Sequence, residues 1–178
     1  TRCSLSGSLV IDEGAVLSIS GDTILENAKI ELLNGKMRIK EGSLELKNSH
    51  IRSFSDEAVL LDYSSLSRLS VESGSIISEN GTAIKSTLGR VEIKGGSVKS
   101  GTSYAIESSS TLILAGSPEI QGCDLDIKTT APITLKSSES ELSSSVRVLY
   151  DESFSEGEIR CIFYSASENS IKNIRSSE

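Results

Sequence analysis

The chain has 178 residues, of which 37% are hydrophobic and 4% aromatic, and its formal net charge is −7. A chain of this length and apolar content can form one domain with its own core. The negative charge argues against a nucleic-acid or anionic membrane partner, because phosphate binding requires a basic patch and the sequence shows none. No apolar run reaches 18 residues, so no membrane insertion is expected.

Apolar residues recur along the chain in sets of three that share one spacing. The sets are Leu17/Ile19/Ile24, Leu44/Leu46/Ile51, Leu69/Val71/Ile76, Val91/Ile93/Val98 and Leu112/Leu114/Ile120, with Ile133/Leu135 in the same phase. Between their second members, successive sets are 27, 25, 22, 21 and 21 residues apart. A further apolar position follows each set, at Leu32, Val59, Ile84, Ile106 and Ile127. Repeats of this length, with period-2 alternation and no helical period, predict an all-β solenoid.

The repeat predicts a parallel β-helix over residues 1–138, with about six coils of 21–27 residues. Each coil has room for three short strands and three turns. Residues 139–145 are almost all Ser and Glu, which ends the repeat, and alternating segments follow at 146–150 and 159–163. An open solenoid end exposes apolar core and unpaired strand edges, so we expect residues 139–178 to contain a short β cap.

Charged residues one repeat apart alternate in sign, which supports the register independently. One outward column holds Lys47, Glu72 and Lys94, followed by Ala115 and Lys136, and another holds Lys85, Glu107 and Lys128. Each such exposed pair stabilises the fold by only about 0.2–1 kcal/mol, so the columns matter mainly as a sign of register. Arg68 above Arg90 is the exception. Two interpretations stay open for this pair: solvated arginines splayed at a coil corner, which we favour, and a small anion site.

Residues 66–150 resemble a known repeat. The relevant segments are Gly95-Gly96-Ser97-Val98, Tyr104-Ala105-Ile106, residues 112–122, Asp124-Leu125-Asp126-Ile127 and Ile133-Thr134-Leu135. This pattern resembles the right-handed, pectate-lyase-like parallel β-helix repeat of large modular surface proteins of Gram-positive gut bacteria. The resemblance implies right-handed coils and an extracellular or cell-surface attached protein, with adhesion or carbohydrate contact as its role. It brings no catalytic residues that could be transferred to this chain.

Enzymes also occur among parallel β-helices, so a polysaccharide lyase or glycoside hydrolase is the alternative function. A hydrolase needs paired carboxylates with one held as an acid, and a calcium-dependent lyase needs several carboxylate oxygens around the cation. Glu119, Asp124 and Asp126 are the candidate metal ligands, although we favour surface acids for all three. His50, the only histidine, is expected to be an exposed polar residue at a strand turn.

We therefore expect no catalytic residues and no cofactor, with calcium as the alternative at those acids. If they are surface acids, replacing Asp124 and Asp126 with Asn changes the free energy of unfolding by less than about 1 kcal/mol. The three cysteines, Cys3, Cys123 and Cys161, are expected to be small buried or terminal residues. A Cys123–Cys161 disulfide is the minor alternative.

Four residues are candidates for ligand binding. Tyr63 and Tyr104 could serve as sugar platforms, and Arg68 and Arg90 could bind an anion. Neither tyrosine stacks with a second aromatic residue in its column, so a ladder of rings is not supported. The favoured interpretation of Tyr104 is a turn residue that covers a coil corner. The sequence thus predicts a non-catalytic extracellular module that serves as adhesin, carbohydrate-contacting domain or structural stalk. Its expected partner is an extracellular polysaccharide or a host or cell-surface protein, and the module is expected to be monomeric within a longer chain.

Overall fold

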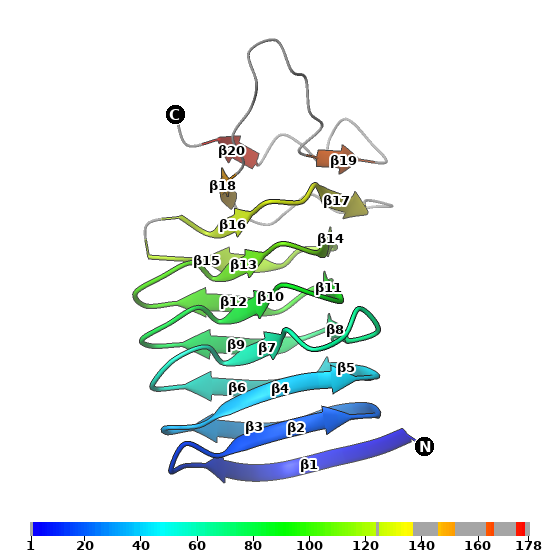
Figure 1. The fold of residues 1–178 in the computed structure, drawn as a ribbon, viewed down its shortest axis with the longest axis vertical. Coiled ribbons are helices and arrows are strands. Elements are labelled where there is room, and N and C mark those ends of the chain that lie inside the picture. Colours follow the sequence, from blue (N-terminus) through cyan, green and yellow to red (C-terminus); the bar gives the residue numbers. More distant parts are fainter. Residues whose placement is uncertain (1, 124, 137–145, 152–162, 166–173, 177–178) are drawn as a thin grey trace.

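The computed structural model describes residues 2–123, 125–136, 146–151, 163–165 and 174–176 (Figure 1). All regular secondary structure in this described part is β-strand. The strands pair in parallel and stack along the long axis of a rod. The fold is a right-handed parallel β-helix of about seven turns. The predicted fold class is therefore confirmed.

Three strand faces run along the rod, and we number them in the order in which each coil visits them. Face 1 consists of β5 (Ser43–Lys47), β8 (Arg68–Val71), β11 (Arg90–Ile93), β14 (Thr111–Ala115), β17 (Ile133–Lys136) and β19 (Phe163–Ser165). Face 2 consists of β6 (Ser49–Ser53), β9 (Gly74–Ser78), β12 (Ser97–Ser100) and β15 (Glu119–Gln121). Face 3 consists of β2 (Val16–Ser20), β4 (Lys36–Glu41), β7 (Val59–Leu61), β10 (Ile84–Ser86), β13 (Ile106–Ser108), β16 (Ile127–Thr129), β18 (Val146–Tyr150) and β20 (Ile174–Ser176).

In the first two coils, one long strand covers both face 1 and face 2. β1 (Arg2–Ile11) pairs with β3 (Asp22–Leu32), and β3 pairs with β5 through its first half and with β6 through its second half. The bend in β3 falls at Asn27, whose φ is 53°. Asn48 and Gly74, at this corner in the next two coils, also have positive φ, 46° and 101° respectively. Asn and Gly are the residues that tolerate positive φ best, so they set the angle between the two faces.

Inward side chains form continuous apolar columns along the rod. Register pairs join the inward residues of neighbouring coils, among them Leu46–Val71, Ile93–Leu114, Leu114–Leu135, Ile51–Ile76, Ile76–Val98, Val98–Ile120, Val59–Ile84, Ile84–Ile106 and Ile106–Ile127. All of these residues are at most 3% exposed. The predicted columns from Leu44 onward are confirmed, and burial of each such side chain stabilises the fold by about 1.5–3 kcal/mol.

The first predicted set is out of register. Leu17 and Ile19 lie on face 3, where they pair with Met37 and Ile39. The residue that precedes Leu46 in its column is Leu25, 21 positions earlier. Ile24 points to the other side of the strand and is partly exposed. The predicted step of 27 residues is therefore wrong, and the chain fits one more coil than the spacing predicted.

Buried hydroxyl groups continue two of the inward columns where apolar side chains stop. Ser53, Ser78 and Ser100 follow one another on face 2, and Ser86, Ser108 and Thr129 do so on face 3. Each hydroxyl donates to a carbonyl oxygen of a neighbouring turn, as Ser78 does to Asp56 at 2.7 Å and Thr129 does to Ala131 at 2.7 Å. These bonds satisfy turn carbonyls that the core would otherwise bury without a partner.

Strands after residue 138 continue the same parallel ladders. β18 pairs with β16 and β20, and β19 pairs with β17. The predicted strand at 146–150 is confirmed as β18, whereas residues 159–162 of the second predicted strand lie outside the described residues. The division of the chain at residues 138 and 139 stays a prediction.

Candidate functional site

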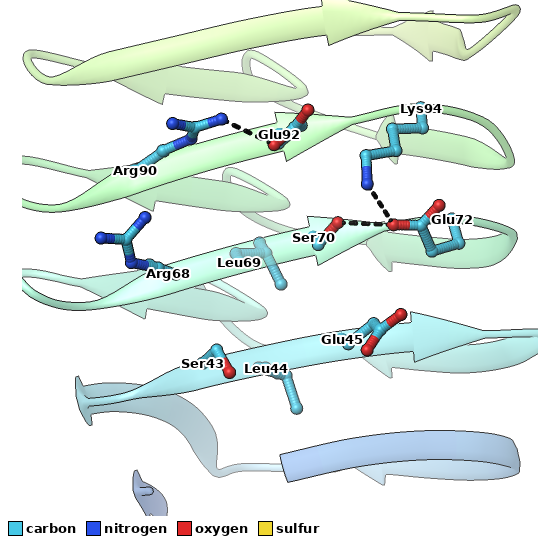
Figure 2. Close-up of a pocket in the computed structure, with 10 residues that line it drawn as sticks. All are labelled: Ser43, Leu44, Glu45, Arg68, Leu69, Ser70, Glu72, Arg90, Glu92 and Lys94. Carbon is cyan, nitrogen blue, oxygen red and sulfur yellow. Dashed lines mark hydrogen bonds and ion pairs between the residues drawn. The ribbon is translucent and has the colours of Figure 1, made fainter. Parts of the chain in front are cut away.

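A groove with a volume of about 350 Å³ runs over the outward surface of β5, β8 and β11 on face 1 (Figure 2). We call it the face 1 groove. Its lining residues are Ser43, Leu44, Glu45, Arg68, Leu69, Ser70, Glu72, Arg90, Glu92 and Lys94. A smaller depression of about 190 Å³ adjoins it, shares Ser43 and Glu45, and extends to β3. Four coils contribute to this surface, a span of about 14 Å along the rod axis at the usual strand spacing.

The carboxylates of the face 1 groove are held by ion pairs and hydrogen bonds. Glu72 Oε1 accepts from Lys94 Nζ at 2.6 Å and from the Ser70 hydroxyl at 2.9 Å. Glu45 pairs with Lys47 at 3.0 Å. Figure 2 shows the Glu72 contacts on one side of the groove and the two arginines on the other. The predicted attraction between Glu72 and Lys94 is confirmed by their contact.

Glu92 is the least exposed acid of the groove, with 15% of its side chain accessible. Arg90 contacts it at 2.9 Å and Lys136 at 3.2 Å. Burial by itself raises the pKa of Glu92, but hydrogen bonds from Arg90 and Lys136 and the positive charges of Lys136 and Lys94 outweigh it, so the pKa lies below 4.5. Glu92 is therefore a carboxylate at neutral pH. The pKa of Lys94 is raised above 10.5, mainly by its hydrogen bond to Glu72, so Lys94 is a cation.

Arg68 and Arg90 are register partners on β8 and β11, which confirms the predicted stack of two cations. Arg90 Nη2 donates to Glu92, so one arginine of the pair is neutralised. Arg68 is exposed, and among the described residues its guanidinium has neither an ion pair nor a side-chain hydrogen bond. Figure 2 shows the two guanidinium groups one above the other at the same end of the groove.

The turn at residues 62–67, between β7 and β8, brings Tyr63 to the corner that leads into Arg68. Tyr63 is 62% exposed and Leu66 is 64% exposed. Ser67 fixes the turn to the coil below, because its buried hydroxyl contacts the carbonyl oxygens of Ile39 at 3.0 Å and Lys40 at 2.8 Å. Lys40 Nζ also lies 5.7 Å from the centre of the Tyr63 ring. Tyr63 thus belongs to the same corner of the coil as Arg68.

Tyr104 lies elsewhere, just before β13 at the corner between faces 2 and 3. Its side chain is partly buried, and Lys128 Nζ lies 5.8 Å from the ring centre. This position agrees with the predicted turn residue that covers a coil corner. Of the four predicted ligand-binding residues, the structure brings Arg68 and Arg90 together in the groove lining. Tyr63 lies in the turn that precedes Arg68, outside that lining, and Tyr104 lies at another corner.

The three candidate metal ligands do not share one site in the described part of the chain. Glu119 is on the outward side of face 2 and pairs with Lys99 at 2.8 Å. Asp126 is 2% exposed at the corner before β16, where it binds Arg147 at 2.8 Å, so the prediction of a surface acid is wrong for it. Asp124 lies outside the described residues. No cluster of three or more His, Cys, Asp or Glu residues suited to a metal ion occurs within the described ranges.

Three smaller predictions concern isolated residues. His50 is exposed on β6, as expected, and its Nδ1 lies 2.8 Å from the Ser75 hydroxyl. Cys3 and Cys123 are exposed, so the expectation of burial is wrong for Cys123, and Cys161 lies outside the described residues. Among the residues that the structure describes, no helix could span a membrane.

Sequence analysis did not identify the middle of the groove, formed by Glu45, Ser70 and Glu92. These residues occupy the central outward position of β5, β8 and β11 and are register partners. Period-2 alternation places them outward, and that signal was present in the sequence. The ion pairs of Glu45 and Glu92 and the hydrogen bond from Ser70 to Glu72 depend on side-chain geometry, which alternation does not specify.

Comparison with known proteins adds no relative. No protein-family model, curated protein or solved structure matches this chain.

Proposed function

We propose that this chain is a non-catalytic module of an extracellular or cell-surface protein, and that its face 1 groove contacts an extended polysaccharide. The observation that carries this proposal is the groove itself, which continues across β3, β5, β8 and β11. A linear surface of this kind suits a polymer better than a compact small molecule. The motif of residues 66–150, which resembles repeats of bacterial surface proteins, supports the extracellular setting.

The stiffness of the groove supports recognition by a preformed surface. Strands with fully buried apolar columns form its floor, and ion pairs such as Lys94–Glu72 fix its polar side chains. A ligand that binds such a surface orders few additional side chains, so less of the interaction free energy is lost to entropy. Tyr63, exposed in the turn that leads into Arg68 and outside the groove lining, offers an amphipathic ring of the type that sugars contact.

The electrostatics of the groove favour binding over hydrolysis. A glycoside hydrolase needs a carboxyl group that stays protonated until it donates to the leaving oxygen, and such groups have raised pKa values. Glu92 has the opposite property, because its pKa is lowered by its cationic neighbours. Glu72 and Glu45 are likewise bound to lysines. Each of these carboxylates contacts a cation, and Glu92, the least exposed of them, lacks the raised pKa of a general acid.

A binding assay with a blocked groove tests the proposal. The purified chain is passed over a panel of immobilised neutral and acidic polysaccharides, with calcium and with a chelator. Ser70→Trp places a large side chain on the outward side of β8 in the middle of the groove, and we expect it to abolish capture. Ser75→Trp makes the same change on face 2 and serves as the matched control. Equal capture by wild type and Ser70→Trp would contradict a role for the groove.

Product analysis separates the two classes of function. Each captured polysaccharide is incubated with the protein and assayed for new reducing ends and for unsaturated sugars. We expect neither product. Accumulation of either one would favour the alternative, a polysaccharide lyase or glycoside hydrolase, and capture of no polysaccharide at all would contradict the binding proposal.

A further inference from the structure

Arg68 and Arg90 lie directly above each other on neighbouring strands of the groove. The ion pairs within the groove do not account for this stack of two cations. Like charges directly opposite each other on neighbouring strands repel and cost stability. One outward column of face 3 alternates in sign, with Lys85, Glu107 and Lys128 as successive register partners. The arginine pair departs from this pattern at one end of the groove.

Neighbouring acids do not neutralise Arg68. Glu92 is bound to Arg90 and Lys136, and Glu72 is bound to Lys94. Asp22, which lies in the same outward column, accepts from the Ser43 hydroxyl at 2.7 Å. Among the described residues that line the groove, Arg68 is thus a cation without a counter-ion, next to a second guanidinium that is already held in place.

Guanidinium groups are suited to oxyanions. Their planar N–H donors match carboxylate and sulfate oxygens in a bidentate geometry, and such charge-assisted bonds are among the strongest in proteins. An anion between two stacked arginines also removes their mutual repulsion. Hydroxyl groups of Ser43 and Thr111 occupy the same outward column on either side of the pair.

We propose that Arg68 and Arg90 form a subsite for the carboxylate or sulfate group of an acidic polysaccharide that lies in the face 1 groove. This inference rests on the proposed function and specifies its ligand class. The chain carries a net charge of −7, so general attraction cannot hold a polyanion to it. Binding therefore depends on the local guanidinium donors, chiefly on Arg68, because the charge of Arg90 is already offset by Glu92. Removal of Arg68 is expected to have a large effect.

The experiment follows the side-chain Nε–H signals of Arg68 and Arg90 by NMR while ligand is added to the folded chain. Three probes are compared: a uronic-acid trisaccharide, its methyl ester, which has the same sugars without the charges, and sodium sulfate. We expect the acidic trisaccharide to shift both signals at concentrations where the methyl ester does not. Sulfate is expected to shift the same signals more weakly, because it lacks the contacts along the groove.

Three variants make the test specific. Arg68→Ala is expected to weaken trisaccharide binding by about tenfold or more, the loss of charge-assisted hydrogen bonds. Arg68→Lys keeps the charge without the bidentate donors, and its affinity for the trisaccharide is expected to lie between those of wild type and Arg68→Ala. Lys99→Ala removes one positive charge from face 2 and is expected to bind like wild type. Arg68 is exposed and unpaired among the described residues, so Arg68→Ala is expected to unfold at the wild-type temperature or above it.

The outcomes separate the subsite from the proposed function. Equal binding of the acid and its ester, or unchanged binding by Arg68→Ala, would overturn the subsite and leave a polysaccharide-binding groove in place. Sulfate that binds as tightly as the trisaccharide would overturn the assignment to a polysaccharide and indicate a free-anion site. If only neutral polysaccharides from the panel are captured, the subsite fails and the groove stands. Capture of no polysaccharide would overturn both.

Discussion

The carboxylate of Asp126 is bound to Arg147 of the following coil through three hydrogen bonds. Arg147 donates from its backbone N–H at 2.7 Å, from Nη2 at 2.8 Å and from Nε at 3.3 Å. Asp126 also accepts from the backbone N–H of Gly122 at 2.9 Å. In the preceding coils the corresponding corner position is a buried alanine, Ala105 in the nearest. Asp126 therefore replaces apolar corner packing with a clamp that joins two coils.

Asp126→Asn is expected to lower the free energy of unfolding by about 2–3 kcal/mol. This is less than the usual cost of about 3–5 kcal/mol for breaking a buried ion pair, because Arg147 is partly exposed and solvent screens its charge. The amide turns one acceptor into a donor that faces Arg147 or Gly122. Urea unfolding followed by circular dichroism measures the change. Glu119→Gln, at an exposed ion pair, is the control and is expected to cost less than about 1 kcal/mol. If Asp126→Asn lost no more stability than the Glu119→Gln control, the contacts between Asp126 and Arg147 would contribute little to folding.

Ile93→Asp is expected to unfold the rod. Ile93 is fully buried between Val71 and Leu114, and an unpaired carboxylate there has no route to water. Ile93→Val removes one methylene group at the same site and is expected to cost only about 0.5–1.5 kcal/mol. Far-ultraviolet circular dichroism distinguishes the two. A folded Ile93→Asp protein would mean that Ile93 does not point into the core.

Gly74→Ala is expected to be much more destabilising than Gly14→Ala. Both glycines have positive φ, 101° and 73° respectively, so an added Cβ strains the backbone in each case. At Gly74 the Cβ would also collide with the backbone of Ser49 in the coil below, whereas at Gly14 it meets no atom within 4 Å. Thermal unfolding of the two variants isolates the collision. Similar melting temperatures would contradict the close approach of the coils at this corner.

Acidification is expected to weaken the fold partly through Glu92. Its pKa is lower in the folded chain than its ordinary value of 4.5, so its contribution to stability is present above pH 4.5 and is lost as the pH falls through the folded value. Melting temperatures measured between pH 6 and 3 should decline less steeply for Glu92→Gln than for wild type below pH 4.5. Parallel curves would show that Arg90 and Lys136 do not stabilise the Glu92 carboxylate.

Alternation and spacing were sufficient to predict the coils from Leu44 onward, because each face there has its own short strand and regular turns. They failed at Leu17 and Ile19, which show the same alternation as Leu44 and Leu46. A period of two gives the side of a strand that faces inward but not which of three faces the strand belongs to. The long strand β3 bends at Asn27, and no glycine marks that bend in the sequence. The corner between faces 1 and 2 therefore could not be located from the sequence, and the register of the first coils depended on it.

The candidate site was predictable only in part. The stack of Arg68 on Arg90 follows from the repeat spacing, and the structure confirms it. The groove beside them depends on side-chain size and pairing across three strands, which no spacing rule specifies. Asp126 was mistaken for a surface acid because acidic residues are seldom buried, and its partner Arg147 lies 21 residues away in a different coil.

The length distribution of a captured polysaccharide, measured before and after prolonged incubation with the protein, tests the proposed function most directly. It is compared for wild type, Ser70→Trp and a sample without protein. A non-catalytic groove predicts that wild type retains the polymer, that its chain length stays the same as in the protein-free sample, and that Ser70→Trp does not retain it. Shortening of the polymer by wild type and not by Ser70→Trp would contradict a non-catalytic role and place an enzyme in the face 1 groove.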